Sequence, residues 1–135
     1  MLVLFVCRAN SKRSQVAAAF FNGMSKKNTA ISAGLEVLQE GNEGIPINPF
    51  NVEIMKGMGY DLSKNVRTQL TREMADKADL IIAMAEKGTL PDYLADSPKL
   101  KYWKIDSTKN MPYGARLEKI NHIKALVEKL VYEIG

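Results

Sequence analysis

The stretch Leu2-Val3-Leu4-Phe5-Val6 decides the fold class of this 135-residue chain. It is an uninterrupted apolar run of strand length, which is typical of a parallel strand buried on both faces of a sheet. Leu80-Ile81-Ile82-Ala83-Met84 has the same character. Such runs alternate along the chain with stretches of helical periodicity. We therefore expect an α/β protein with three α/β/α layers and a four-stranded parallel sheet, doubly wound in the flavodoxin-like manner.

Apolar periodicity, helix caps and stop signals predict the remaining elements. The expected strands span residues 2–6, 28–32, 80–84 and 102–105, and the expected helices span residues 14–26, 48–59, 71–78, 90–94 and 115–134. The irregular stretch 35–47 contains Gly41, Gly44 and Pro46. We expect it to form a loop that overhangs a site.

Composition and length indicate one globular domain over residues 1–135. Hydrophobic residues make up 46% and charged residues 25% of the chain, which leaves no room for a long disordered tail. The formal net charge is +4, and the basic residues are spread out. This pattern suits a small anionic ligand or a phosphorylated partner better than a nucleic acid, which usually meets a clustered basic stripe.

The cysteine count and the hydropathy pattern indicate a cytoplasmic protein. A single cysteine cannot form an internal disulfide, so nothing calls for an oxidising compartment. A spanning helix would need about 20 apolar residues in a row, and the sequence has no such run. We expect no membrane association.

The cysteine, Cys7, directly follows the first predicted strand, at the end of the sheet where ligands bind. Arg13 lies six residues later, and the five residues between them can wrap backbone N–H groups around a tetrahedral oxyanion. Arg13 would clamp two oxygens of that anion, and the helix that follows would aim its positive end at the same point. The residues expected to contact the anion, besides Arg13, are Arg8, Ala9, Asn10, Ser11, Lys12 and Ser14.

The same positive field favours a thiolate at Cys7, and the Ser14 hydroxyl is placed to donate to its sulfur. A cysteine can become nucleophilic in this way without a histidine base. The alternative is a small buried hydrophobe, which is the commoner role of a cysteine at a strand end, and the spacing by itself decides little. The preceding strand, the following helix and Asn10, which tolerates the left-handed backbone of a tight loop, favour the anion loop.

A strand, Cys7-x5-Arg13-Ser14 and a helix, in this order, resemble the low-molecular-weight protein tyrosine phosphatase family, which shares its fold with thioredoxin-coupled arsenate reductases. The likeness runs almost from end to end. Further landmarks in the order of the family are Ser32-Ala33-Gly34, Gly59-Tyr60-Asp61-Leu62-Ser63, Gln69-Leu70-Thr71, Ala78-Asp79-Leu80-Ile81 and Asp106.

The resemblance implies that Cys7 attacks phosphorus to form a phosphocysteine while Arg13 and the loop amides stabilise the equatorial oxygens. It also implies that Asp106 is the general acid, which protonates the leaving oxygen and later activates water. The sequence places Asp106 directly after the last predicted strand, on the ligand-binding edge of the sheet. Without the resemblance, Asp106 would be assigned to an Asx turn.

Several positions depart from the family pattern. Ala9 stands where the family usually has glycine, and Lys12 stands where a second loop cysteine often precedes the arginine. Arg8 and Lys12 are either solvated charges at the rim or an additional source of positive potential. Ser107 replaces the proline that commonly follows the acid, and Tyr113 is the nearest tyrosine available for an aryl-binding wall.

Two further positions bear on the support of the loop. Asn65 takes the place of a histidine found in many phosphatases and is expected, with Ser32, to support the loop by a hydrogen bond to Asn10. Gln15, after Arg13-Ser14, is more similar to the reductase branch.

These residues predict a metal-independent phosphomonoesterase, in particular a protein-tyrosine phosphatase acting on a phosphorylated protein or a small aryl phosphate. A single-cysteine arsenate reductase that uses an external small thiol is the first alternative, and a non-catalytic phosphate-binding module is the second. With one cysteine and one histidine, His122, we expect neither a zinc site nor a cofactor.

Overall fold

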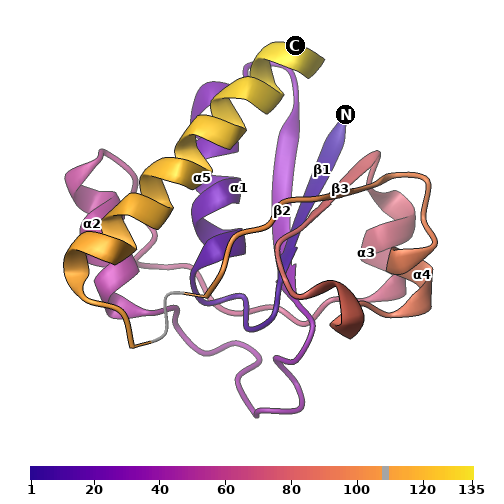
Figure 1. Ribbon diagram of the computed structural model, residues 1–135, viewed down its shortest axis with the longest axis horizontal. Coiled ribbons are helices and arrows are strands. Elements are labelled where there is room, and N and C mark those ends of the chain that lie inside the picture. The colour runs from indigo at the N-terminus through magenta and orange to yellow at the C-terminus, as the bar shows by residue number, and fades with distance from the viewer. Residues whose placement is uncertain (108–109) are drawn as a thin grey trace.

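The computed structural model describes residues 1–107 and 110–135 and contains one parallel sheet of four strands (Figure 1). The strands are β1 (Leu2–Cys7), β2 (Thr29–Gly34), β3 (Leu80–Ala83) and β4 (Leu100–Tyr102), and their order in the sheet is β2-β1-β3-β4. In the centre, Val6 of β1 pairs with Ala33 of β2 and with Ala83 of β3. This topology confirms the predicted fold class.

Helices connect the strands. The helical segments are α1 (Arg13–Met24), α2 (Pro49–Gly57), α3 (Arg72–Lys77), the 3₁₀ turn η1 (Lys87–Thr89), α4 (Asp92–Ala95) and α5 (Tyr113–Ile134). The side chain of Asn48 caps α2 by accepting from the backbone N–H groups of Phe50 and Asn51. None of the described helices is both long and apolar enough to cross a membrane.

The apolar run of β1 is buried on both sides, as its sequence predicts. Val3, Phe5 and Cys7 face one core cluster with α1, α2 and α5, while Leu4 and Val6 face a second cluster with α3 and α4. Figure 1 shows the same division, with α1, α2 and α5 on one side of the sheet and α3 and α4 on the other. Cys7 is the last residue of β1 and so lies at the carboxyl end of that strand.

The position of the last strand differs from the prediction. β4 ends at Tyr102, because its partner β3 is only four residues long and the ladder stops at Ala83. Trp103 donates its backbone N–H to the Ala83 oxygen at 2.9 Å and packs its ring against Phe5, and the chain then leaves the sheet. Asp106 therefore lies four residues beyond the strand instead of directly after it.

Candidate active site

The loop between β1 and α1 holds a buried thiol against a hydroxyl group. Cys7 is 2% exposed, and its sulfur lies 3.0 Å from the Ser14 oxygen. Asn10 Nδ2 donates to the same Ser14 oxygen at 2.7 Å. Because the amide hydrogen occupies a lone pair of the hydroxyl oxygen, the hydroxyl hydrogen is free to point at the sulfur. In this orientation the Ser14 hydroxyl can donate to the Cys7 sulfur.

Asn10 fixes the path of the loop. It adopts φ of 52°, in the left-handed region, and its side chain is fully buried. Its Nδ2 also donates to the Ser32 hydroxyl at 3.0 Å, and its Oδ1 accepts from the Thr68 backbone N–H at 2.9 Å. One side chain therefore ties the loop to β2 and to the segment that precedes α3.

Gln15 takes part in this network, a role that the sequence did not predict. Its Nε2 donates to Asn10 Oδ1 at 3.0 Å and to the Val66 carbonyl at 3.1 Å. Asn65 Nδ2 donates to Gln15 Oε1 at 3.0 Å, so the contact expected between Asn65 and Asn10 runs through Gln15. A glutamine at the start of α1, directly after the residue that contacts the thiol, was the only signal for it in the sequence.

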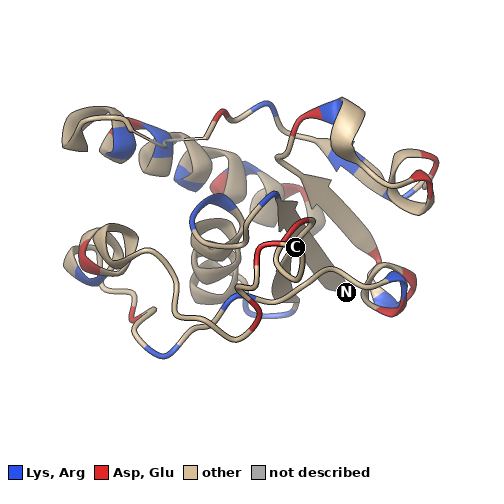
Figure 2. Cartoon of the chain, turned by 90° about the horizontal axis from the view of Figure 1, so that it is seen from below, with Lys and Arg blue, Asp and Glu red and all other residues tan. Residues whose placement is uncertain are grey.

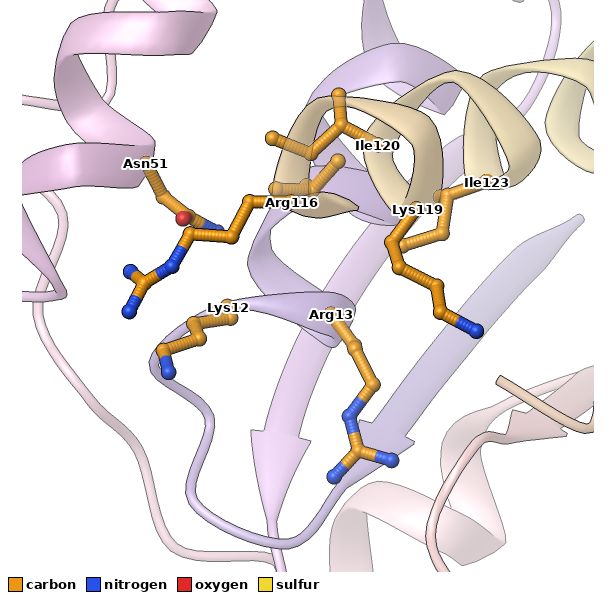
Figure 3. Close-up of a pocket in the computed structure, with 8 residues that line it drawn as sticks. Lys12, Arg13, Asn51, Arg116, Lys119, Ile120 and Ile123 are labelled. Carbon is orange, nitrogen blue, oxygen red and sulfur yellow. The ribbon is translucent and has the colours of Figure 1, made fainter. Parts of the chain in front are cut away.

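Arg13 is held by carbonyl groups from two distant segments. It is 7% exposed, and its Nη1 donates to the Met84 oxygen at 2.6 Å and to the Ile105 oxygen at 2.8 Å. Figure 3 shows its guanidinium turned toward the loop. Since one nitrogen is occupied by the two carbonyls, the planar group keeps a fixed orientation and can present its other N–H groups to an anion.

Asp106 is joined to this arrangement through its neighbour. The Ile105 carbonyl that accepts from Arg13 directly precedes Asp106, and the Asp106 side chain is exposed. The bond to Arg13 thus holds the backbone of Asp106 at the rim of the loop, although the strand ends earlier than the sequence predicts. Tyr113, the expected aryl contact, is 62% exposed at the start of α5.

The side chain of Arg8 is paired with acidic side chains. Its guanidinium pairs with Glu36 and lies 3.8 Å from Glu40, both in the segment after β2. The hydrogen bond to Glu36, together with the negative charge of that carboxylate, raises the pKa of Arg8. These carboxylates balance the charge of Arg8, whose side chain is 58% exposed.

The loop also packs closely against its neighbours. Ser11 accepts a hydrogen bond from the Asn48 backbone N–H through its hydroxyl oxygen, at 3.1 Å, which ties the loop to the start of α2. A Cβ atom on Gly34 would lie 2.8 Å from the Asn10 nitrogen and 2.9 Å from the carbonyl carbon of Ala9, so only glycine fits at that position. Lys12 lies at the N-terminus of α1 (Figure 3).

The described residues contain no group of three or more His, Cys, Asp or Glu side chains that could hold a metal ion. Within the described ranges, Lys and Arg residues are distributed over several elements and do not gather in one stripe (Figure 2). The site brings together a thiol, a hydroxyl and a fixed guanidinium, and Asp106 directly follows the residue whose carbonyl binds that guanidinium.

A family model and a solved structure both point to the same protein family. The model of the low molecular weight phosphotyrosine protein phosphatase family matches residues 2–98. A low molecular weight protein tyrosine phosphatase from T. tengcongensis has a similar structure, with a TM-score of 0.84, 30% identity and 99% of each chain covered.

Two other similar proteins carry different names from the phosphatase above. Wzb of Vibrio vulnificus, solved in complex with benzylphosphonate, superposes with a TM-score of 0.90 over 98% of each chain, but at 18% identity it shows the fold alone. A glutaredoxin arsenate reductase of Synechocystis sp. is 27% identical over 139 aligned positions, which cover 98% of each chain. Phosphatases and arsenate reductases thus both occur among the relatives.

Proposed function

Because this chain belongs to the low molecular weight phosphotyrosine protein phosphatase family, we propose that it is a metal-independent phosphomonoesterase that acts on aryl phosphates through Cys7. Phosphotyrosine on a protein is the natural substrate of this chemistry, and a small aryl phosphate can replace it. The observation that carries the proposal is the 3.0 Å contact between the Cys7 sulfur and the Ser14 oxygen, next to a guanidinium fixed by two carbonyls.

In the first step, the Cys7 thiolate attacks phosphorus in line with the ester bond. An S–P bond forms and the P–O bond to the aryl group breaks, while Asp106 gives its proton to the leaving oxygen. Arg13 and the loop amides stabilise the charge on the three equatorial oxygens. The bonds of Arg13 to Met84 and Ile105 pre-orient it for this task.

In the second step, water attacks the phosphocysteine and Asp106 takes up a proton from it. The S–P bond breaks, inorganic phosphate leaves and the thiolate is restored with the hydroxyl hydrogen of Ser14 directed at it. The exposure of Asp106 supports this role, because the carboxyl must meet both the leaving group and solvent water.

Hydrolysis of p-nitrophenyl phosphate in the presence of a chelator tests the proposal. We expect turnover by the wild type and none by Cys7→Ser. Asp106→Asn should lose more rate on phenyl phosphate than on p-nitrophenyl phosphate, because the p-nitrophenolate leaving group hardly needs a proton. Turnover by Cys7→Ser would show that Cys7 is not the nucleophile. Equal losses of rate on the two esters would show that Asp106 is not the general acid.

Arsenate reduction is the second candidate, favoured by Gln15 and by the glutaredoxin arsenate reductase among the relatives. Reduction of arsenate to arsenite takes two electrons, and this sequence holds one cysteine. An external thiol would have to supply the second sulfur and form a mixed disulfide with Cys7, and a second external thiol would then have to release Cys7 by exchange. Arsenite formation with glutathione or mycothiol would establish this activity. If no thiol supports arsenite formation, the phosphatase proposal stands alone.

A further inference from the structure

Gln15 lies within a chain of hydrogen bonds that ends at the Cys7 sulfur. Its side chain, in the first turn of α1, is 5% exposed, so any influence on the reaction must pass through its neighbours. The successive bonds run from Asn65 Nδ2 to Gln15 Oε1 (3.0 Å), from Gln15 Nε2 to Asn10 Oδ1 (3.0 Å), from Asn10 Nδ2 to the Ser14 oxygen (2.7 Å) and between that oxygen and the Cys7 sulfur (3.0 Å). We call Asn65, Gln15, Asn10 and Ser14 the relay.

Two backbone groups fix the direction of the relay. The Thr68 N–H can only donate, and it donates to Asn10 Oδ1 at 2.9 Å, so the oxygen of that amide must face it. The Val66 carbonyl can only accept, and it accepts from Gln15 Nε2 at 3.1 Å, so the nitrogen of that amide must face it. Each of the two amides therefore accepts at the end away from the sulfur and donates at the end toward it.

The orientation of the Asn10 amide decides where the Ser14 hydroxyl hydrogen points. The two hydrogens of Asn10 Nδ2 have one acceptor each, the Ser14 oxygen at 2.7 Å and the Ser32 oxygen at 3.0 Å. The Ser14 hydroxyl therefore receives a hydrogen from Asn10 and can direct its own hydrogen at the sulfur. If the amide turned over, its oxygen would face Ser14 and would draw the hydroxyl hydrogen away from Cys7.

Gln15 holds both the side chain and the backbone of Asn10. It is one of two donors to Asn10 Oδ1, and its Nε2 also lies 3.3 Å from the Asn10 backbone oxygen. That residue has a left-handed backbone, with φ of 52°. Buried hydrogen bonds that follow one another in the same direction polarise each other, so the donor on Gln15 strengthens the bond from Asn10 to Ser14.

We propose that Gln15 is a positioning residue for the nucleophile, which keeps the Ser14 hydroxyl turned to the Cys7 sulfur while the phosphocysteine is hydrolysed. In that step the S–P bond breaks and its electron pair stays on the sulfur, where the hydroxyl hydrogen meets it. The inference rests on the proposed function and deepens it. Arg13, the proposed ligand of the phosphate oxygens, is no member of the relay, so loss of Gln15 should slow turnover and leave phosphate affinity intact.

Rapid-quench kinetics with p-nitrophenyl phosphate, measured well below Tm, test the proposal. Release of p-nitrophenol reports formation of the phosphocysteine, and release of phosphate reports its breakdown. Gln15→Leu should slow breakdown by about 3–10-fold, as for one lost hydrogen bond. The inhibition constant of inorganic phosphate should stay within about 2-fold of the wild-type value, because the lost interaction is not made to bound phosphate.

A double-mutant cycle separates positioning from general damage to the loop. In a Ser14→Ala background there is no hydroxyl to orient, so adding Gln15→Leu should change the breakdown rate by less than about 2-fold. If Gln15→Leu fails to fold, Gln15→Met takes its place, because it keeps a long unbranched side chain and lacks the N–H donor.

Asn22→Leu is the matched control on the same helix. The Asn22 side chain accepts from the Ala30 N–H at 2.8 Å and donates to the Ala30 oxygen at 3.0 Å, outside the relay. Its loss strands two backbone groups, as the loss of Gln15 strands its own partners. Asn22→Leu should therefore lower Tm and leave the breakdown rate of the folded enzyme unchanged.

Three results would overturn the inference alone, in a wild type that turns over. An unchanged breakdown rate in Gln15→Leu would leave this residue a purely structural role. An equal loss of rate with and without the Ser14 hydroxyl would show that Gln15 does not act through Ser14. A loss of phosphate affinity as large as the loss of rate would show that the variant distorts the whole loop. Absence of turnover by the wild type would instead refute the proposed function, and the inference with it.

Discussion

Replacing Gly34 by alanine should damage both stability and activity. The new Cβ would lie 2.7 Å from Val37 Cγ2, 2.8 Å from the Asn10 nitrogen and 2.9 Å from the Ala9 carbonyl carbon. Two of these atoms are backbone, so the loop itself must move. Gly34 cannot move instead, because its N–H donates to Thr68 and its oxygen accepts from Leu70, at 2.9 and 2.8 Å.

The expected cost follows from this crowding. Overpacking of a close-fitting contact costs about 1–3 kcal/mol, which at this chain length lowers Tm by about 4–12 °C. The displaced Asn10 amide belongs to the anion loop, and a shift of about 1 Å in a reacting geometry can cost about 100-fold in rate. Gly34→Ala should therefore lose more activity than its fraction of unfolded protein explains.

Thermal unfolding and p-nitrophenyl phosphate kinetics, measured well below Tm, check this prediction. Gly57→Ala is the matched control, because a Cβ there meets nothing within 4 Å and the residue ends α2. It should be neutral or stabilise by up to about 1 kcal/mol. If Gly34→Ala unfolds at the wild-type temperature with unchanged kcat, the reasoning about the close approach is wrong.

Three further predictions concern the surroundings of the loop. Ser14→Ala removes the hydroxyl 3.0 Å from the Cys7 sulfur and should lower kcat by about 10–100-fold, as for a lost hydrogen bond to a charged group; full activity would contradict that contact. Gln15→Leu strands its partners Asn10 and Val66 and should reduce the free energy of unfolding by about 1–3 kcal/mol in urea titrations, whereas Asn65→Ala, at the exposed end of the network, should cost less. Hydrogen bonds from Ser63 lower the pKa of Asp61, so this carboxylate stabilises the fold above its unfolded-state pKa of about 3.9, and the benefit is lost as pH falls through the lower folded value. Ser63→Ala should raise the pKa of Asp61, which NMR titration would measure. An unchanged pKa would mean that the Ser63 hydroxyl does not cause the lowering.

The local parts of the site could be predicted from the sequence. An apolar run buried on both faces identifies β1. The seven residues from Cys7 to Arg13 are enough to form a closed loop by themselves. The left-handed Asn10 and the contact of Ser14 with Cys7 belong to the same segment. Interactions over such short separations are set by backbone geometry and residue type, which the sequence states directly.

The end of β4 could not be predicted in the same way. Residues 102–105 have the composition of a strand, but the pairing stops where β3 ends, at Ala83. The length of a parallel strand depends on its neighbour as much as on its own residues. The predicted position of Asp106, directly after the last strand, was therefore wrong: it lies four residues beyond the end of β4.

By itself, the sequence determined the fold class, the anion loop and its nucleophile candidate, because these depend on periodicity and on contacts within a few residues. The tertiary structure alone decided what surrounds that loop. It brings the carbonyls of Met84 and Ile105, 71 and 92 residues away, onto Arg13, and it packs α5 against α1. The physical reason is that these contacts come from the docking of β3 and the 103–107 segment on the loop and of α5 on α1. Side-chain packing sets that docking, and no local pattern encodes it.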